Sequence, residues 1–169
     1  MKLIGICGAK GSGKSQAADY LVMHRYHLLS MATVMKNMLI TMGISHNYIF
    51  TNKEEIIPEL GCTGRHLLQT LGTEWGRDTI HKDIWVMAMA KHLKDYRKPV
   101  VIDDIRFSNE VAMIRNLGGK IVYIQRDSAE AVTDGHSSEQ LYKSVVADRV
   151  IRNNGTLSEF QDKIPSILT

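Results

Sequence analysis

Short apolar runs alternate along this chain with longer stretches in which apolar residues return at the spacing of a helix. The apolar runs, typical of buried strands, cover residues 2–7, 26–29, 100–102, 120–125 and 149–151. The helical patterns cover residues 14–24, 31–42, 109–117 and a closing stretch from residue 156. Because strands that alternate with helices build parallel sheets, the pattern predicts an α/β fold, one three-layer domain with helices on both faces of the sheet.

The middle of the chain divides less regularly. Between residues 65 and 93 the helical pattern is interrupted near Gly72 and Gly76 and again at Lys82-Asp83. Glycine weakens a helix interior, so these interruptions predict two helices joined by a tight bend. Residues 45–64 are polar and predict a loop with at most one helical turn. Residues 126–139 are also polar and predict a mobile segment.

The first apolar run leads directly into a glycine-rich sequence that matches the pattern G-x-x-x-x-G-K-[ST]. A strand that delivers this loop and a helix that leaves it aim backbone N–H groups at phosphate oxygens. In such loops the lysine spans the β- and γ-phosphates, and the final hydroxyl coordinates Mg²⁺. The match predicts a site for a nucleoside triphosphate with Mg²⁺, built from Gly8, Ala9, Lys10, Gly11, Ser12, Gly13, Lys14 and Ser15. The loop alone does not say which nucleotide binds.

An aspartate pair, Asp103-Asp104, ends the apolar strand at residues 100–102. A carboxylate at that position lies beside the phosphate loop, so Asp103 is a candidate to hold Mg²⁺ together with Ser15. The alternative is that Asp103 only caps a helix or forms a turn. The sequence disfavours a GTPase, since residues 52–55, the nearest match to the guanine-reading run Asn-Lys-x-Asp, lack the aspartate.

Three arginines outside the phosphate loop are candidates to bind a phosphate monoester. Arg65 lies one helical turn from Gln69, so the two share a face, and Arg77 follows the glycines. Arg106 lies between a strand and the next helix, where ligands bind in open α/β sheets. The planar guanidinium suits a phosphate better than a lysine does. The alternative for these side chains is a solvated surface with ordinary ion pairs.

Composition excludes several other classes. The 169 residues carry a net charge of +3 with Lys and Arg scattered along the chain, so a nucleic-acid partner is not expected. No run approaches the ~20 apolar residues of a membrane span, and none resembles a secretory signal, so a cytoplasmic location without membrane contact is expected. Cys7 and Cys62 form no zinc-binding pair and are expected to be buried thiols.

Four motifs together resemble the bacteriophage deoxynucleoside monophosphate kinases. They are the phosphate loop, the stretch from Arg65 to Arg77, the sequence Asp83-x-Trp85-Val86, and the segment from Asp104 to Glu110 followed by Gly118-Gly119. The resemblance covers most of residues 2–139. It implies a P-loop kinase fold and conversion of a deoxynucleoside monophosphate to its diphosphate with ATP and Mg²⁺, in the host cytoplasm if a phage encodes the chain.

The resemblance also implies roles for particular residues. Sugar and base contacts would fall on Trp85, Asp104, Arg106 and Glu110, with a monophosphate-binding region over about residues 30–95 and a lid over about residues 126–139. The C-terminal sequence from residue 148 to 157 resembles the part of nucleotide kinases that packs beside the adenine, which makes Asn154 a candidate ATP contact. For Trp85, packing in the core of its helix remains an open alternative.

Catalysis by such a site would rest on alignment and charge neutralisation, because a nucleotide phosphate is already an oxyanion and needs no strong base. The candidate catalytic residues are Lys14, Arg106 and Arg126, the last at the end of the fourth strand and the start of the expected lid. His136 in that lid either contacts phosphate or belongs to a polar surface.

Two other functions remain open from the residues alone. One is a P-loop kinase for a different small molecule, such as an isoprenoid or coenzyme precursor. The other is a regulatory protein in which ATP holds a surface for a partner. The expected partners of the chain are small nucleotide substrates, and a homodimer is compatible with the sequence.

Overall fold

The chain forms two compact units, each with its own secondary structure. The structure, a computed structural model, describes residues 2–130 and 146–168. The sheet unit comprises Met1–Ser30 and Lys94–Thr169, and the helical unit comprises Met31–Leu93. The helical unit nearly coincides with the region of residues 30–95 expected to bind the monophosphate, but that binding role stays a prediction.

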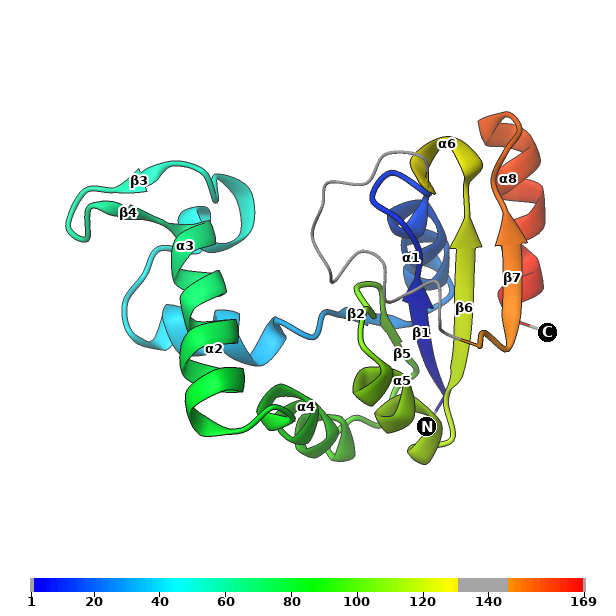
Figure 1. The fold of residues 1–169 in the computed structure, drawn as a ribbon. Helices are drawn as coiled ribbons and strands as arrows, with labels where there is room; N and C mark the ends of the chain where they lie inside the picture. The colour runs from blue at the N-terminus through cyan, green and yellow to red at the C-terminus, as the bar shows by residue number, and fades with distance from the viewer. Residues whose placement is uncertain (1, 131–145, 169) are drawn as a thin grey trace. The chain divides into compact units, whose positions relative to one another are not determined.

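A parallel five-stranded sheet forms the centre of the sheet unit (Figure 1). In the order β2-β5-β1-β6-β7, its strands are His27–Leu29, Val100–Ile102, Leu3–Cys7, Lys120–Gln125 and Arg149–Arg152. The first strand, β1, lies in the middle, where Leu3 pairs with Val100 and Gly5 pairs with Ile121. Every strand expected from an apolar run is therefore confirmed.

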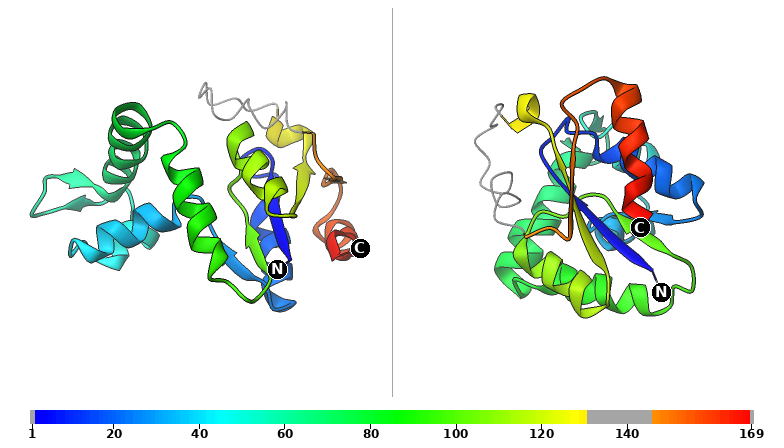
Figure 2. Two further views of the ribbon diagram at one scale, coloured as in Figure 1. Left: turned by 90° about the horizontal axis from the view of Figure 1, so that it is seen from below. Right: turned by 90° about the vertical axis from the view of Figure 1, so that its right-hand side faces the viewer.

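Helices cover both faces of this sheet. On one face, α1 (Lys14–Met23) and α8 (Leu157–Lys163) contribute Leu21 and Phe160 to a buried cluster that includes Ile4 and Ile6 of β1. On the other face lies α5 (Ser108–Asn116), so close to β1 that a Cβ on Gly5 would stand 2.4 Å from Cδ1 of Ile114. The right-hand view of Figure 2 shows α8 and α5 on opposite sides of the strands. The three-layer α/β prediction is confirmed.

Two short helices complete the described part of the sheet unit. The first, α6 (Asp127–Glu130), follows β6 directly, and the 3₁₀-helix η4 (Ile164–Leu168) follows α8. The expected lid of residues 126–139, with His136, lies outside the described residues from position 131 onward. Only its first five residues can therefore be placed on the fold.

The helical unit contains four helical segments and a small hairpin. Its helices are α2 (Thr33–Thr41), the π-helix η1 (Asn47–Thr51), α3 (Gly64–Gln69) with the π-helix η2 (Thr70–Ile80), and α4 (Ile84–Lys94). The hairpin pairs β3 (Ile56–Ile57) with β4 (Cys62–Thr63). The hairpin was not expected, because residues 45–64 show no alternation of apolar and polar positions long enough to indicate strands.

The expected helix break near Gly72 and Gly76 is wrong. Helix α3 continues into η2 without interruption, and the chain turns only after Ile80, before α4. These glycines serve close packing, since a Cβ on Gly76 would lie 2.6 Å from the indole of Trp85 and one on Gly72 would lie 3.0 Å from Sδ of Met35. A glycine in a helical pattern therefore marks a place where a large side chain approaches the backbone.

Two expectations from composition can also be checked. Cys7 is buried as expected, whereas Cys62 in the hairpin is only partly buried, because a two-stranded ribbon leaves much of its surface in contact with solvent. Within residues 2–130 and 146–168, no helix is both long enough and apolar enough to span a bilayer.

Candidate active site

The phosphate loop joins the end of β1 to the start of α1. Its three glycines, Gly8, Gly11 and Gly13, have φ angles of 145°, 79° and 107°, a region that other residues rarely adopt. At Gly8 a Cβ would also stand 2.4 Å from the carbonyl oxygen of Ile124. Both the conformation and the close approach to β6 require glycine, so the loop has the backbone geometry that the pattern predicts.

The side chain of Lys14 curls back into this loop. Its ammonium donates hydrogen bonds to the carbonyl oxygens of Gly8 at 2.9 Å and Ala9 at 2.8 Å. A positive charge is thus held at the centre of the loop, where the phosphates of a nucleotide would lie. The next residue, Ser15, is exposed in the first turn of α1.

The nearby thiol of Cys7 has no nucleophilic part in this site. Burial raises its pKa to about 12, an effect that the charge of Lys14 opposes only in part. The thiol donates a weak hydrogen bond to the carbonyl of Val122, with Sγ and the oxygen 3.6 Å apart. Because only a thiolate is a strong nucleophile, Cys7 acts as an apolar core residue at neutral pH.

Asp103 and Asp104 follow β5 at the edge where β1 ends. The backbone N–H of Ile105 donates to the carbonyl of Ile6 at 3.2 Å, which keeps this segment beside the phosphate loop. Both carboxylates are partly buried. The oxygens of Asp103 and Ser15 are the kind of ligand that Mg²⁺ binds, so these two residues fit the predicted metal-binding role by chemistry and by strand position.

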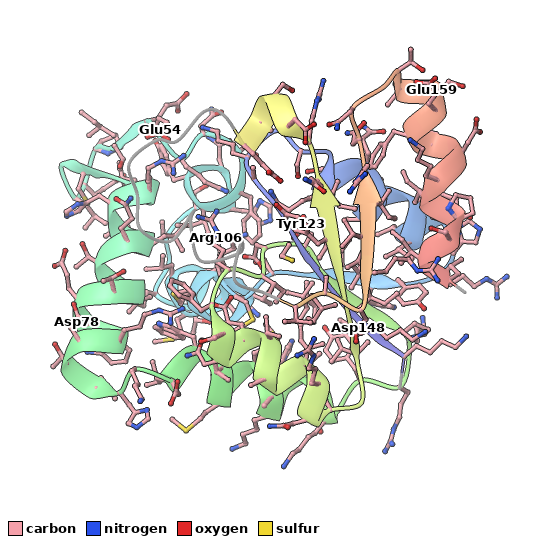
Figure 3. The ribbon with its side chains drawn as sticks, turned by 45° about the vertical axis from the view of Figure 1, so that its right-hand side comes forward. Glu54, Asp78, Arg106, Tyr123, Asp148 and Glu159 are labelled. Atoms are coloured by element: carbon pink, nitrogen blue, oxygen red, sulfur yellow. The ribbon has the colours of Figure 1, made fainter. Side chains whose placement is uncertain are left out.

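Glu110, predicted to contact a sugar hydroxyl, has a structural role at the start of α5. Its side chain is 2% exposed, and Oε2 accepts hydrogen bonds from the backbone N–H groups of Arg106 at 2.8 Å and Phe107 at 3.1 Å. A carboxylate at the third position of α5 satisfies donors that the helix start leaves free. Glu110 therefore shapes the backbone that presents Arg106, and the contact with substrate stays a prediction. Arg106 itself is exposed (Figure 3).

The loop after β7 contacts the phosphate loop through a residue that the sequence reasoning missed. Asn153 is 7% exposed, and its side-chain amide donates to the carbonyl of Ser12 at 2.8 Å. The neighbouring Asn154, predicted as an ATP contact, is exposed and exchanges two hydrogen bonds with Asp127. An asparagine at the end of a strand was the available signal, but the sequence could not tell which of two neighbours turns inward.

Arg126 reaches the phosphate loop from β6. One of its guanidinium nitrogens, Nη1, donates to the carbonyl of Gly11 at 3.3 Å. Arg126, Lys14, Asp103 and Asp104 thus all belong to the carboxyl end of the sheet, as the order of strands predicts.

The helical unit holds the other predicted contacts. Arg65 and Gln69 are exposed on α3, and Arg77 is partly buried on η2, the continuation of the same helix. The guanidinium of Arg65 donates to the carboxylate of Glu54, which precedes the hairpin and is labelled in Figure 3. Both partners of this ion pair are more than half exposed, so it contributes little to stability and could be exchanged for a phosphate at small cost.

Trp85 is a core residue of the helical unit. It is 2% exposed, and its indole N–H donates to the carbonyl of Gly72 at 2.8 Å. The ring also packs against Gly76 and lies 6.1 Å, between ring centroids, from the half-exposed Trp75. These contacts favour the core alternative over the predicted wall of a nucleoside pocket.

Comparison with known proteins gives one consistent result. A family model described as deoxynucleotide monophosphate kinase matches residues 42–164. A putative deoxynucleotide monophosphate kinase of Acanthamoeba polyphaga mimivirus is 35% identical over 185 residues, an alignment that spans 98% of this chain and 95% of the relative. A deoxynucleotide monophosphate kinase of Escherichia phage RB69 is 32% identical over 108 residues, which span 62% of this chain and 44% of the relative.

The fold has a counterpart among solved structures. A dephospho-CoA kinase from Campylobacter jejuni superposes with a TM-score of 0.58 at 14% identity, over 99% of this chain and 96% of that one. At this identity the likeness concerns the fold alone, and it agrees with the P-loop kinase architecture expected from the sequence.

Proposed function

The chain belongs to the deoxynucleotide monophosphate kinase family, and from this premise we propose that it transfers the terminal phosphoryl group of ATP to the phosphate of a deoxynucleoside monophosphate. The products are the deoxynucleoside diphosphate and ADP. The observation that carries the proposal is the phosphate loop with Lys14 at its centre, in a chain that matches this family over most of its length.

Within this proposal Lys14 and Arg126 act on the transferred group. The oxygen that attacks is an anionic phosphate oxygen of the monophosphate, so no residue has to remove a proton from it. A bond forms from that oxygen to the γ-phosphorus, and the bond from the γ-phosphorus to the oxygen that bridges to the β-phosphate breaks. Lys14 and Arg126 stabilise the charge that moves onto this bridging oxygen and the three oxygens of the transferred group.

Ser15 and Asp103 would hold Mg²⁺, which would neutralise phosphate charge when bound. In the helical unit, the proposed contacts of the acceptor are Arg65, Gln69 and Arg77. In the sheet unit, Arg106 is a proposed contact of its phosphate and Asp104 of its nucleoside. Guanidinium groups suit this task because they donate two parallel hydrogen bonds to a phosphate.

The test is ADP release measured with a panel of acceptors in separate reactions. The panel contains the four deoxynucleoside monophosphates, the corresponding ribonucleoside monophosphates, and an isoprenoid or coenzyme precursor as the alternative type of acceptor. We expect turnover that depends on a deoxynucleoside monophosphate. We expect Lys14→Ala to lower kcat by roughly 10²–10³, the effect of losing one electrostatic stabiliser of a transition state. Lys120→Ala is the matched control, because Lys120 is exposed at the opposite, amino end of β6.

Two results would contradict the proposal. One is turnover that requires a different acceptor, which would make the chain a kinase of another substrate class. The other is full activity in Lys14→Ala, which would remove the phosphate loop from the reaction.

A further inference from the structure

Two neighbouring asparagines after β7, Asn153 and Asn154, form hydrogen bonds with different parts of the sheet unit. Asn153 is buried and donates to the carbonyl of Ser12 in the phosphate loop at 2.8 Å, while its own backbone N–H donates to Gln125 of β6, also at 2.8 Å. Asn154 bonds away from that loop, to Asp127. Since the two residues are adjacent, Asn154 occupies a place fixed with respect to the phosphate loop and the end of β6.

The hydrogen bonds between Asn154 and Asp127 are reciprocal. The side-chain oxygen of Asn154 accepts from the backbone N–H of Asp127 at 2.9 Å, and its side-chain NH₂ donates to the carboxylate of Asp127 at 2.7 Å. Both polar atoms of the asparagine side chain are therefore used within the protein. A residue bonded in this way, through one N–H and one lone pair of its amide, holds a backbone segment in place.

The segment that Asn154 holds is α6, which is too short to be stable alone. Its far end is attached to β6, since the hydroxyl of Tyr123, a residue labelled in Figure 3, donates to the carboxylate of Glu130. Its near end follows Arg126, whose carbonyl accepts from the N–H groups of Ala129 and Glu130, each at 3.0 Å. With both ends of α6 held, the backbone of Arg126 is fixed and its guanidinium meets the carbonyl of Gly11.

We propose that Asn154 is a positioning residue, which places Arg126 beside the phosphate loop through its paired hydrogen bonds to Asp127. Asn153 supplies the link that keeps Asn154 in register with that loop. This inference rests on the proposed function, in which Arg126 contacts the transferred phosphoryl group. It replaces the earlier assignment of Asn154 as an ATP contact.

Exchanging the side chains of Asn154 and Asp127, singly and together, tests this role. In Asn154→Asp, two carboxylates would face each other and one hydrogen bond would be lost. In Asp127→Asn, the amide of Asn154 can still donate to the new side chain, so the defect should be smaller. In the double variant Asp127→Asn with Asn154→Asp, both hydrogen bonds can form again: the backbone N–H of residue 127 still donates to the side chain of residue 154, and the side chain–side chain bond forms in the opposite direction.

The readouts are kcat for the monophosphate and the dissociation constant of ATP measured without acceptor. We expect Asn154→Asp and Asn154→Ala to lower kcat about tenfold, the equivalent of one hydrogen bond to a charged group, with the ATP constant within about twofold of wild type. The double variant should recover most of kcat. In an Arg126→Ala background, Asn154→Ala should have little further effect, because residues that act as a unit are not additive.

Asn116→Asp is the matched control, because it makes the same change at an exposed position of α5. Thermal unfolding of each variant establishes that it is folded, and Asn154→Ala replaces Asn154→Asp if like charges unfold the latter. The inference is overturned if substitution of Asn154 weakens ATP binding while kcat is kept, or if the exchanged pair is as slow as Asn154→Asp. A wild-type enzyme without monophosphate turnover would instead overturn the proposed function.

Discussion

Trp85 is the residue in which packing and ligand binding compete most directly for one side chain. Its indole N–H is bonded to Gly72 and its ring fills the space that Gly76 leaves open. Burial to 2% exposure is typical of an aromatic core residue whose one polar atom has found a partner. A selectivity for deoxyribose over ribose would then depend on other side chains.

A substitution tests this conclusion. Trp85→Phe removes the hydrogen bond and leaves the carbonyl of Gly72 buried without that donor, so we expect a loss of about 1–3 kcal/mol in the free energy of unfolding. The ratio of kcat/KM for deoxyribonucleotide and ribonucleotide acceptors should stay that of wild type. Thermal unfolding and the two kinetic constants measure this, with Trp75→Phe as the control at the 42% exposed neighbour. An unchanged melting temperature together with a relaxed preference for deoxyribonucleotides would show that Trp85 contacts the substrate.

The residues that differ most from the sequence-based prediction share one physical cause. Lys14 shows the contrast: it belongs to a pattern of eight consecutive residues that determines the backbone conformation of the loop, so the position of its side chain could be predicted. Glu110 and Trp85 belong to motifs that name residue types without specifying whether the side chain turns toward solvent or toward the backbone. Their hydrogen bonds to Arg106 and Gly72 depend on packing, which a motif does not encode.

Among the elements, the end of α1 has an unusual residue. Arg25 has φ of 68°, the left-handed conformation that ordinarily favours glycine. Its N–H donates to the carbonyl of Val22 at 2.9 Å, and the N–H of Tyr26 donates to that of Leu21 at 3.0 Å. Tyr26 and Leu21 also belong to one buried cluster. The helix thus ends in a Schellman motif with arginine at the glycine position.

Arg25→Gly should stabilise the protein. Relief of the left-handed conformation is worth about 1–2 kcal/mol, and the greater freedom of glycine in the unfolded chain offsets about 0.5–1 kcal/mol of that. We expect a net gain of roughly 0.5–1 kcal/mol, read from urea unfolding. Arg25→Ala is the control, since it keeps the strained backbone and removes only the side chain. Equal stability of the two variants would show that the backbone at this position carries no strain.

The start of α8 predicts a pH dependence. Hydrogen bonds from the backbone N–H and hydroxyl of Thr156 lower the pKa of Glu159 from its usual value of 4.5. A carboxylate whose pKa is lowered by folding contributes stability above pH 4.5, and this contribution is lost as the pH falls through the folded-state pKa. Glu159→Gln should therefore flatten the acid side of the stability profile below about pH 4.5.

Urea unfolding at a series of pH values between 3 and 7 measures that profile. Asp162→Asn is the matched control, since it removes an exposed carboxylate from the same helix. A profile for Glu159→Gln parallel to that of wild type would mean that the cap contributes nothing to acid sensitivity.

The helices and strands were predicted correctly wherever the apolar residues kept a single spacing along the whole element. The strands appear as apolar runs in the sequence because both faces of a parallel sheet are covered. Helices α1, α5 and α8 show a helical period because each packs on the sheet with only one side. The exceptions are η2, where glycines serve the approach of Trp85, the β3–β4 hairpin, whose strands of two residues are too short to carry a pattern, and α6, a four-residue helix at the start of the polar residues 126–139.

At the scale of the whole molecule, nucleotide binding should couple to stability. ATP contacts proposed for the phosphate loop exist only in the folded sheet unit. A ligand at about 100 times its dissociation constant stabilises the folded state by about 2.7 kcal/mol. For a chain of this size that corresponds to a rise of roughly 5–10 °C in melting temperature.

Differential scanning calorimetry with and without ATP measures this rise. Lys14→Ala should lose most of it, and Lys120→Ala should keep it. If the two units melt in separate transitions, only the transition of the sheet unit should move. A rise of equal size in wild type and Lys14→Ala would place the bound ATP outside the phosphate loop.

The central place of β1 in the sheet has a consequence for folding during synthesis. This strand is made first, yet its neighbours begin only at Val100 and Lys120. Until those residues have left the ribosome, β1 has no strand to pair with along either of its edges. The helical unit, Met31–Leu93, is complete in the chain before either neighbour exists. The nascent chain can therefore gain its local helical contacts early, whereas the sheet that carries the phosphate loop closes only after Val100–Ile102 and Lys120–Gln125 have been made.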